Sequence, residues 1–194
     1  MEADWEFELG PDAQGLAAPV IDAGWAGFVD LERDPTRVDH LPETAQLPGL
    51  TDALVKLNAA GSPVWTSKCD VWAKLEAGEF DLDEMDAPPG HSAHAMGCYI
   101  DLLPRKDQPW VEPEMAATVC RELCRHLRAV PLRCCRADLV IRRAFILPNA
   151  ANEQPECLGV TAYLTSCGAS SADAQRTIQT ALAAFADAFV SKRR

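Results

Sequence analysis

The chain has 194 residues, of which 48 % are hydrophobic and 24 % charged, and its net charge is −11. A chain of this length and composition forms one well-buried core, as soluble globular proteins do, and is too short for two full domains. Its acidic residues concentrate in the first 110 positions. Such a surface repels phosphate, so we expect no nucleic-acid partner.

Targeting and membrane segments are not expected either. No apolar run approaches the roughly 20 residues that a membrane span needs, and the acidic start Met1-Glu2-Ala3-Asp4 is unlike a secretory signal. We therefore predict a cytoplasmic protein without membrane contact. In that setting the eight cysteines are expected to be reduced thiols rather than a disulfide framework.

Residues 1–62 are predicted to form an amino-terminal arm and a first helix that pack on the core. Trp5–Leu9 alternates apolar and acidic residues, which is typical of a short edge strand whose charges discourage aggregation. Gly27–Leu31 is a second candidate strand. A helix is expected from about residue 50 to 60, where leucines recur on one face.

Residues 63–194 are predicted to be a core built on a faint internal repeat, within a single domain overall. Each copy has a basic residue two positions before an aspartate, an apolar strand, a glycine that opens a second strand, and a helix. The first copy comprises Lys68–Trp72, Gly97–Leu102 and about 113–130, and the second Arg136–Val140, Gly159–Leu164 and about 172–190. This order favours an α+β fold, an antiparallel sheet with helices on one face, of which a ferredoxin-like arrangement is the most economical form.

One face of that sheet is a candidate binding site. Because strand side chains alternate, the face opposite the helices can be read from the sequence. It is expected to carry Lys68, Asp70, Trp72, Tyr99, Asp101, Arg136, Asp138, Arg142, Thr161 and Tyr163. The same alternation places Trp65 on the opposite, inward face with Cys69.

These side chains allow more than one role. In a binding site the aromatic rings supply contact area, Lys68, Arg136 and Arg142 meet an anionic group, and Asp70 and Asp138 orient them. Alternatively, the opposite charges are structural cross-strand pairs and the rings form a subunit contact. A third alternative makes Asp70 and Asp138, which are equivalent in the repeat, a catalytic acid–base pair.

A cluster of candidate metal ligands follows a long acidic loop, residues 76–93. His91, His94 and Cys98 carry the imidazoles and thiol that zinc prefers, at spacings that let them converge. Against a zinc site, no Cys-x-x-Cys pair is present, and Cys98 falls on the inward side of its strand. Exposed, unliganded histidines are the alternative.

The helix near 113–130 contains two further cysteines. Cys120 and Cys124 share a helix face, close to His126, where a thiol could act as a nucleophile or, more commonly, fill a helix–sheet contact. The apolar stripe expected on this helix is Met115, Val119, Leu123, Leu127 and Val130. Farther on, Cys134 and Cys135 are adjacent, so they cannot both point into one core from a strand.

The sequence thus predicts a soluble protein that binds a small polar ligand or a protein partner on its sheet face, without a cofactor. A homodimer is one expected use of that face. The alternative function is an enzyme of unassigned reaction, working through the sheet carboxylates or through a metal held by His91, His94 and Cys98. No phosphate-binding loop, nucleophile elbow or zinc-protease motif occurs in the chain.

Overall fold

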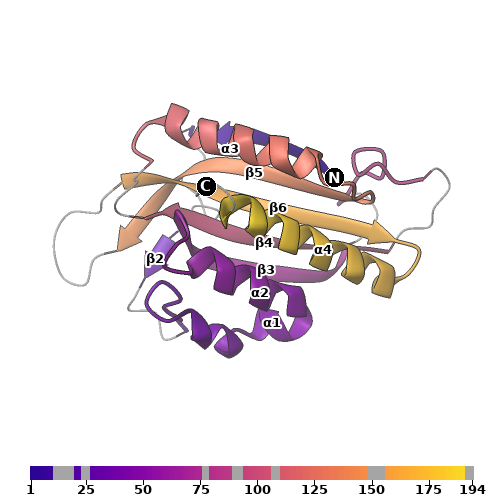
Figure 1. Cartoon of the computed structure of the whole chain (residues 1–194), viewed down its shortest axis with the longest axis horizontal. Coiled ribbons are helices and arrows are strands. Elements are labelled where there is room, and N and C mark those ends of the chain that lie inside the picture. Colours follow the sequence, from indigo (N-terminus) through magenta and orange to yellow (C-terminus); the bar gives the residue numbers. More distant parts are fainter. Residues whose placement is uncertain are drawn as a thin grey trace.

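A mixed β-sheet with helices on one face organises the chain (Figure 1). The computed structural model describes residues 1–10, 20–22, 27–75, 79–88, 94–105, 110–147 and 156–190. The sheet order is β1-β5-β6-β4-β3, and β2 also pairs with β5. The strand bounds are Glu2–Glu8 (β1), Val20–Asp22 (β2), Val64–Leu75 (β3), His94–Pro104 (β4), Cys135–Leu147 (β5) and Glu156–Gly168 (β6).

The prediction of a purely antiparallel sheet is wrong, although the mixture of strands and helices is confirmed. Both β1 and β2 run parallel to β5. A parallel pair needs a long connection, and more than a hundred residues separate β1 from β5. The expected strand at Gly27–Leu31 is also absent, since these residues form no strand in the structure.

Four α-helices of the described residues lie on the same side of the sheet (Figure 1). They are α1 (Pro42–Gln46), α2 (Pro48–Asn58), α3 (Pro113–Arg128) and α4 (Ser171–Val190), preceded by a 3₁₀ turn at Pro35–His40. Proline stands in the first turn of α1, α2 and α3, where its missing N–H costs no helical hydrogen bond. Among the described residues, no helix has the length and apolarity that crossing a membrane requires.

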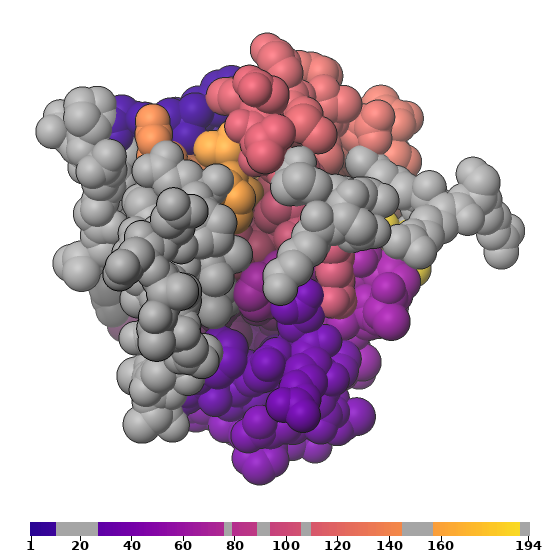
Figure 2. Space-filling view, turned by 90° about the vertical axis from the view of Figure 1, so that its left-hand side faces the viewer, coloured from indigo at the N-terminus to yellow at the C-terminus, as the bar shows by residue number. Residues whose placement is uncertain are grey.

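The main core lies between these helices and the sheet. Helix α3 packs on β1 and β5, α4 packs on β6 and β4, and α2 packs on α4 and β3. Figure 2 shows the end of the molecule at which β5 ends, with α3 at the top and the segment from residue 27 to 60 at the bottom. In α4, Phe185 and Phe189 are fully buried and their rings meet edge to face at 5.4 Å.

The apolar stripe of α3 differs from the predicted one. Leu123 and Leu127 are buried as expected, but Met115 is 45 % exposed. The helix turns Ala116, Ala117, Cys120 and Cys124 toward the sheet instead. Small side chains let the helix approach the sheet closely, so the buried stripe follows alanines and cysteines rather than the largest apolar residues.

A β-bulge in β3 overturns one assignment of side chains to faces. Thr66 pairs with Leu102 and Cys69 with Ile100, so β3 has one more residue than β4 across this step. The extra residue reverses the alternation. Trp65 therefore lies on the same side as its partner Leu103, opposite the helices, and not on the inward face with Cys69.

Candidate functional site

We call the sheet face opposite the helices the outer face. Its central feature is a cross-strand row that runs over four strands. Tyr99 on β4 is directly opposite Tyr163 on β6. Asp70 on β3 is opposite Tyr99, and Asp138 on β5 is opposite Tyr163. Two tyrosines thus lie side by side with one aspartate at each end of the row.

Three rings form an aromatic cluster: Tyr99 and Tyr163 on this row, and Trp72, which pairs with Gly97 in the neighbouring row. Their centroids are 5.7 Å (Trp72–Tyr99), 6.3 Å (Trp72–Tyr163) and 6.0 Å (Tyr99–Tyr163) apart. Trp72 is 38 % exposed, and both tyrosines are half-buried. The cluster therefore offers a partly open apolar surface with two hydroxyl groups.

Gly97 makes room for the indole of this cluster. It is the cross-strand partner of Trp72, and a Cβ atom at Gly97 would lie 3.2 Å from Cε3 of the Trp72 ring. A side chain there would require the ring to shift by a few tenths of an ångström. The absence of a side chain on β4 thus lets the Trp72 ring lie close to the sheet.

Two small apolar clusters lie at opposite ends of the outer face. One, the loop cluster, joins Met85 and Phe80 of the acidic loop to Cys134, just before β5, and to strand residues that include Cys167. The other joins Trp65 and Phe28 to residues on β4, β5 and β6, and the Trp65 Nε1–H donates to the Pro104 carbonyl at 3.2 Å. The aromatic row lies between these clusters.

Asp101 is a buried carboxylate next to the aromatic row. It is 2 % exposed and accepts a 2.6 Å hydrogen bond from the hydroxyl of Thr161, its cross-strand partner. Burial raises the pKa of Asp101 to about 6, while the Thr161 hydrogen bond and the charges of Lys68 and Arg142 act in the opposite direction. Asp101 thus changes its charge near neutral pH.

Arg142 is held by two partners on the outer face. Its Nε–H donates to a carboxylate oxygen of Glu8 at 2.5 Å, and Nη1 donates to the Tyr163 hydroxyl at 2.9 Å. The guanidinium carbon also lies 5.5 Å from the centroid of the Tyr163 ring, within cation–π distance. Only 8 % of Arg142 is exposed.

Arg136, also on β5, is neutralised beside the Asp138 end of the row. Its Nε–H donates to both carboxylate oxygens of Asp138, at 2.7 and 2.9 Å, and Nη1 lies 3.1 Å from Glu84 of the acidic loop. Burial raises the pKa of Asp138, and the Arg136 hydrogen bond and charge oppose this shift.

The two remaining charged residues of the predicted site lie on β3. Lys68 and Asp70 are both exposed. The charge of Lys68 acts on Asp101, and Asp70 accepts a hydrogen bond from the Val71 N–H at 2.7 Å. The structure thus places all the predicted outer-face residues on one side of the sheet.

The charge balance of this face differs from the one the sequence suggested. Arg136 and Arg142, which were expected to meet an anionic group, are both in ion pairs within the chain. The register also places the acidic side of β1 next to β5 on this face. Acids then outnumber bases: Glu2, Asp4, Glu6, Glu8, Asp70, Asp101 and Asp138 against Lys68, Arg136 and Arg142.

Sequence reasoning missed Glu8 and Glu84, which hold the two arginines. Glu84 lies in a run of acids from residue 79 to 86 in which no spacing singles it out. Glu8 lies in an alternating strand whose neighbour in the sheet is distant in sequence. Only the tertiary structure identifies either contact: the parallel pairing of β1 with β5 for Glu8, and the position of the acidic loop for Glu84.

The residues predicted to bind a metal are not brought together by the described part of the chain. His91 lies outside the described residues. His94 is exposed, whereas Cys98 is fully buried, and burial raises the pKa of its thiol. Four residues along a strand span about 13 Å. Within the described ranges no group of three or more His, Cys, Asp or Glu side chains could hold a metal ion.

The cysteines of α3 fill the helix–sheet contact. Cys120 and Cys124 are buried in the main core, and burial raises the pKa of the Cys124 thiol to about 11. A thiol with a raised pKa is a poor nucleophile near neutral pH. His126 uses Nδ1 within α3, at 2.7 Å from the Glu122 carbonyl.

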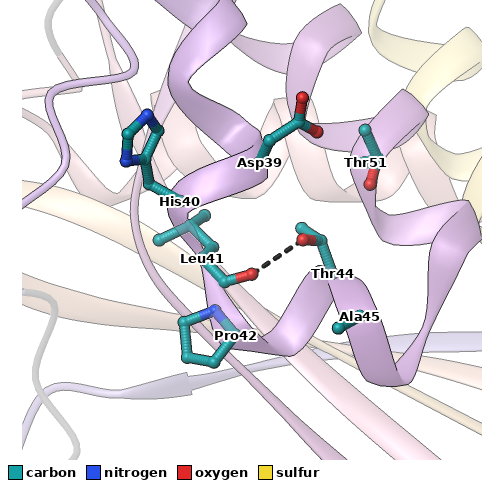
Figure 3. A pocket seen from close by; sticks show the side chains of 7 residues that line it. All are labelled: Asp39, His40, Leu41, Pro42, Thr44, Ala45 and Thr51. Carbon is teal, nitrogen blue, oxygen red and sulfur yellow. Dashed lines mark hydrogen bonds between the residues drawn. The ribbon is translucent and has the colours of Figure 1, made fainter.

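A pocket that the sequence did not indicate lies at the start of α1 (Figure 3). It has a volume of about 400 Å³ and is lined by Asp39, His40, Leu41, Pro42, Thr44, Ala45 and Thr51. The Thr44 hydroxyl donates to the Leu41 carbonyl at 2.7 Å, so it serves the helix start. The His40 ring points away from the Asp39 carboxylate (Figure 3), and these side chains do not converge on one point.

Comparisons with protein-family models, curated proteins and solved structures gave no match to this chain. The outer face must therefore be interpreted from its own chemistry.

Proposed function

We propose that this protein is a binding protein whose outer sheet face takes a small polar ligand with a positively charged group. The observation that carries the proposal is the aromatic cluster of Trp72, Tyr99 and Tyr163, which stays partly open beside carboxylates. Aromatic faces attract cations within about 6 Å of the ring centroid. A planar or quaternary cation on these rings gains both contact area and electrostatic attraction.

The charge balance supports a cation rather than an anion. The carboxylate of Asp70 is exposed at one end of the aromatic row. At the other end, Arg136 is already paired with Asp138 and Glu84. An anion would have to displace these carboxylates and would meet the acidic residues of β1. At the Asp70 end, beside Trp72 and Tyr99, a cation meets a carboxylate without displacing the Arg136 or Arg142 ion pairs.

The proposal can be tested with three probes of one shape and different charge: benzamidine (cationic), benzamide (neutral) and benzoate (anionic). The indole N–H signals of the isotopically labelled protein report binding by NMR, and a Trp72→Phe variant identifies the signal of Trp72. We expect benzamidine to shift the Trp72 signal in a saturable way, benzamide to bind at least tenfold more weakly, and benzoate not to bind.

The matched variants are Trp72→Ala and Phe7→Ala. Phe7 is 44 % exposed and lies in the inward-facing series of β1, opposite Ile141. We expect Trp72→Ala to lower benzamidine affinity at least tenfold and Phe7→Ala to leave it unchanged. Saturable benzoate binding that depends on Trp72 would contradict the choice of a cation. Absence of binding by all three probes would contradict the proposed site.

A second candidate function, acid–base catalysis, is favoured by one observation. Asp101 is a buried carboxyl whose pKa is raised to about 6, and its row with Thr161 is the next same-face row to that of Tyr99 and Tyr163. A carboxyl with that pKa can exchange a proton at neutral pH. Direct NMR titration of the Asp101 side-chain carboxyl tests this candidate, since a value near 4 would remove its basis.

We also propose that the two strand–strand–helix units are copies of one ancestral unit, as the sequence suggested. The register supports this, because Asp70 opposite Tyr99 has its counterpart in Asp138 opposite Tyr163. In addition, β4 and β5 flank β6, as in the split arrangement of ferredoxin-like sheets. In this proposal the aromatic cluster lies at the junction of the two units.

A further inference from the structure

The start of β5 and the end of β6 bring two cysteines together. Cys135 pairs with Ser166, so one step farther along the same antiparallel register Cys134 lies opposite Cys167. The Cys167 N–H donates to the Cys134 carbonyl at 2.9 Å. Their side chains are also within hydrogen-bond contact.

This position meets the geometric requirement of a disulfide. Directly opposed residues of an antiparallel pair have Cα atoms about 4.5–5.5 Å apart, and disulfides join Cα atoms about 4.4–6.8 Å apart. Both thiols belong to the loop cluster, with Met85 of the acidic loop packed among the same residues. The existing strand pairing already places the two side chains in contact.

The backbone of Cys134 is unusual. Its φ is 60°, in the left-handed region, which a residue with a Cβ atom rarely adopts. The neighbouring Arg133 forms a two-point ion pair with Asp86, at 2.6 and 3.1 Å. The acidic loop thus holds the start of β5 in this conformation, against Cys167.

We propose that Cys134 and Cys167 are a reversible redox pair that closes to an intramolecular disulfide at the edge of the loop cluster. Among the free cysteines of the described residues, the other neighbouring pairs lack this arrangement. Cys69 is opposite Ile100 rather than Cys98. Cys120 and Cys124 are one turn apart on a single helix and both face the sheet.

The reaction is a thiol–disulfide exchange with a low-molecular-weight disulfide such as oxidised glutathione. Cys134, the half-buried thiol, loses its proton and attacks one sulfur of the oxidant, so that one glutathione leaves as a thiolate. The Cys167 thiol then loses its proton and attacks the Cys134 sulfur, releasing the second glutathione. Two protein thiols are oxidised and one glutathione disulfide is reduced to two thiols.

The difference between the two cysteines fixes the order of these steps. Cys167 is only 2 % exposed, and burial together with the contact to Cys134 raises the pKa of its thiol to about 12. It therefore does not react with a bulky oxidant directly. It reacts only with the sulfur that already lies against it.

The test is oxidation of the full chain with oxidised glutathione, followed by intact mass and peptide mapping without reduction. We expect the wild-type protein to lose two hydrogens and to yield a single cross-linked peptide pair of Cys134 and Cys167. Dithiothreitol should restore the original mass. The cross-link closes a loop of about 30 residues, so the oxidised protein should also melt at a higher temperature.

Two single variants distinguish this pair from general thiol reactivity. Cys167→Ser should keep one glutathione as a stable mixed disulfide on Cys134, and Cys134→Ser should take up none at Cys167. Cys157→Ser removes a half-buried thiol at the far end of the outer face and should oxidise like the wild type. Circular dichroism melts of each variant show whether it is folded.

Two results would overturn the proposal. One is a folded wild-type protein that carries glutathione on Cys134 without closing the disulfide. The other is a folded Cys134→Ser variant that still loses two hydrogens, since the cross-link would then involve other cysteines.

Discussion

Asp101 is a residue whose ionisation is opposed by its surroundings. Its folded-state pKa of about 6 is higher than the roughly 3.9 of an unfolded aspartate. The native state then binds this proton more tightly, so the contribution of Asp101 to stability is most favourable below about pH 4, falls between about pH 4 and 6, and stays at its low value above that. The two-unit difference corresponds to about 3 kcal/mol at pH 8.

We therefore predict that Asp101→Asn raises the free energy of unfolding by about 1–3 kcal/mol at pH 8. The amide oxygen can still accept from the Thr161 hydroxyl, while the buried charge is gone. The gain should shrink as the pH falls toward 4.5. Urea unfolding at pH 4.5, 6 and 8 measures it, with Asp70→Asn as the exposed control. A variant less stable than the wild type at pH 8 would show that the Asp101 charge stabilises the fold.

At this scale the sequence predicted the faces of many side chains but not their partners. Alternation is a property of each strand alone, and it placed Tyr99, Asp101 and Tyr163 opposite the helices, as observed. Trp65 was assigned to the wrong face because the bulge before Cys69 is set by pairing with β4. The ion pairs of Arg142 with Glu8 and of Arg136 with Glu84 join residues that are far apart in the sequence.

The acidic loop covers the end of the outer face at which β4 begins and β6 ends. Met85 is 1 % exposed in the loop cluster, although the residues around it are mostly charged. Glu84 and Asp86 reach Arg136 and Arg133 on the neighbouring segment. One buried side chain and two ion pairs thus attach this loop to the sheet.

We predict that Met85→Ala detaches the loop without unfolding the sheet. The lost apolar contact should lower the free energy of unfolding by about 1–3 kcal/mol and speed amide hydrogen exchange from residue 79 to 88. Exchange in β4 and β6 should change little. Met115→Ala is the matched control, because Met115 is 45 % exposed on α3 and its truncation should cost less than about 0.5 kcal/mol. Unchanged exchange in the loop would mean that the ion pairs alone hold it.

The predicted helices and strands agree best with the structure where the sequence carries a strong local pattern. Helices α2, α3 and α4 begin within two residues of the expected positions, because prolines and apolar periodicity mark their first turns. The face that α3 buries was predicted less well, since it depends on how closely the helix approaches the sheet. The strand expected at residues 27–31 was wrong because a short segment with apolar residues does not by itself provide a pairing partner.

The sequence predicted a homodimer as one use of the outer face, and the structure of a single chain does not test this prediction. The electrostatics of the whole molecule indicate how such a dimer would respond to salt. A twofold contact through the outer face would bring the acidic residues of two copies together. Such repulsion is screened by salt, because the Debye length falls from about 10 Å at 0.1 M to about 3 Å at 1 M.

We predict that self-association through the outer face strengthens with ionic strength. Sedimentation velocity at 20 and 500 mM NaCl measures it, with Trp72→Ala as the variant that removes the most exposed ring of the face. Dimer content should rise with salt in the wild type and fall in Trp72→Ala. If the dimer content changed neither with NaCl concentration nor in Trp72→Ala, the dimer would use another surface.

The sequence by itself determined helices α2, α3 and α4, the two hairpins and most of the side chains that their strands turn outward. These follow from short-range geometry: a period near 3.6 in helices, a period of two in strands, and proline at helix starts. Only the tertiary structure decided that β4 pairs with β6, that β1 joins β5 in parallel, and that a bulge turns Trp65. These features depend on packing between distant segments, and the aromatic row, its acidic surroundings and the Cys134–Cys167 contact all result from them.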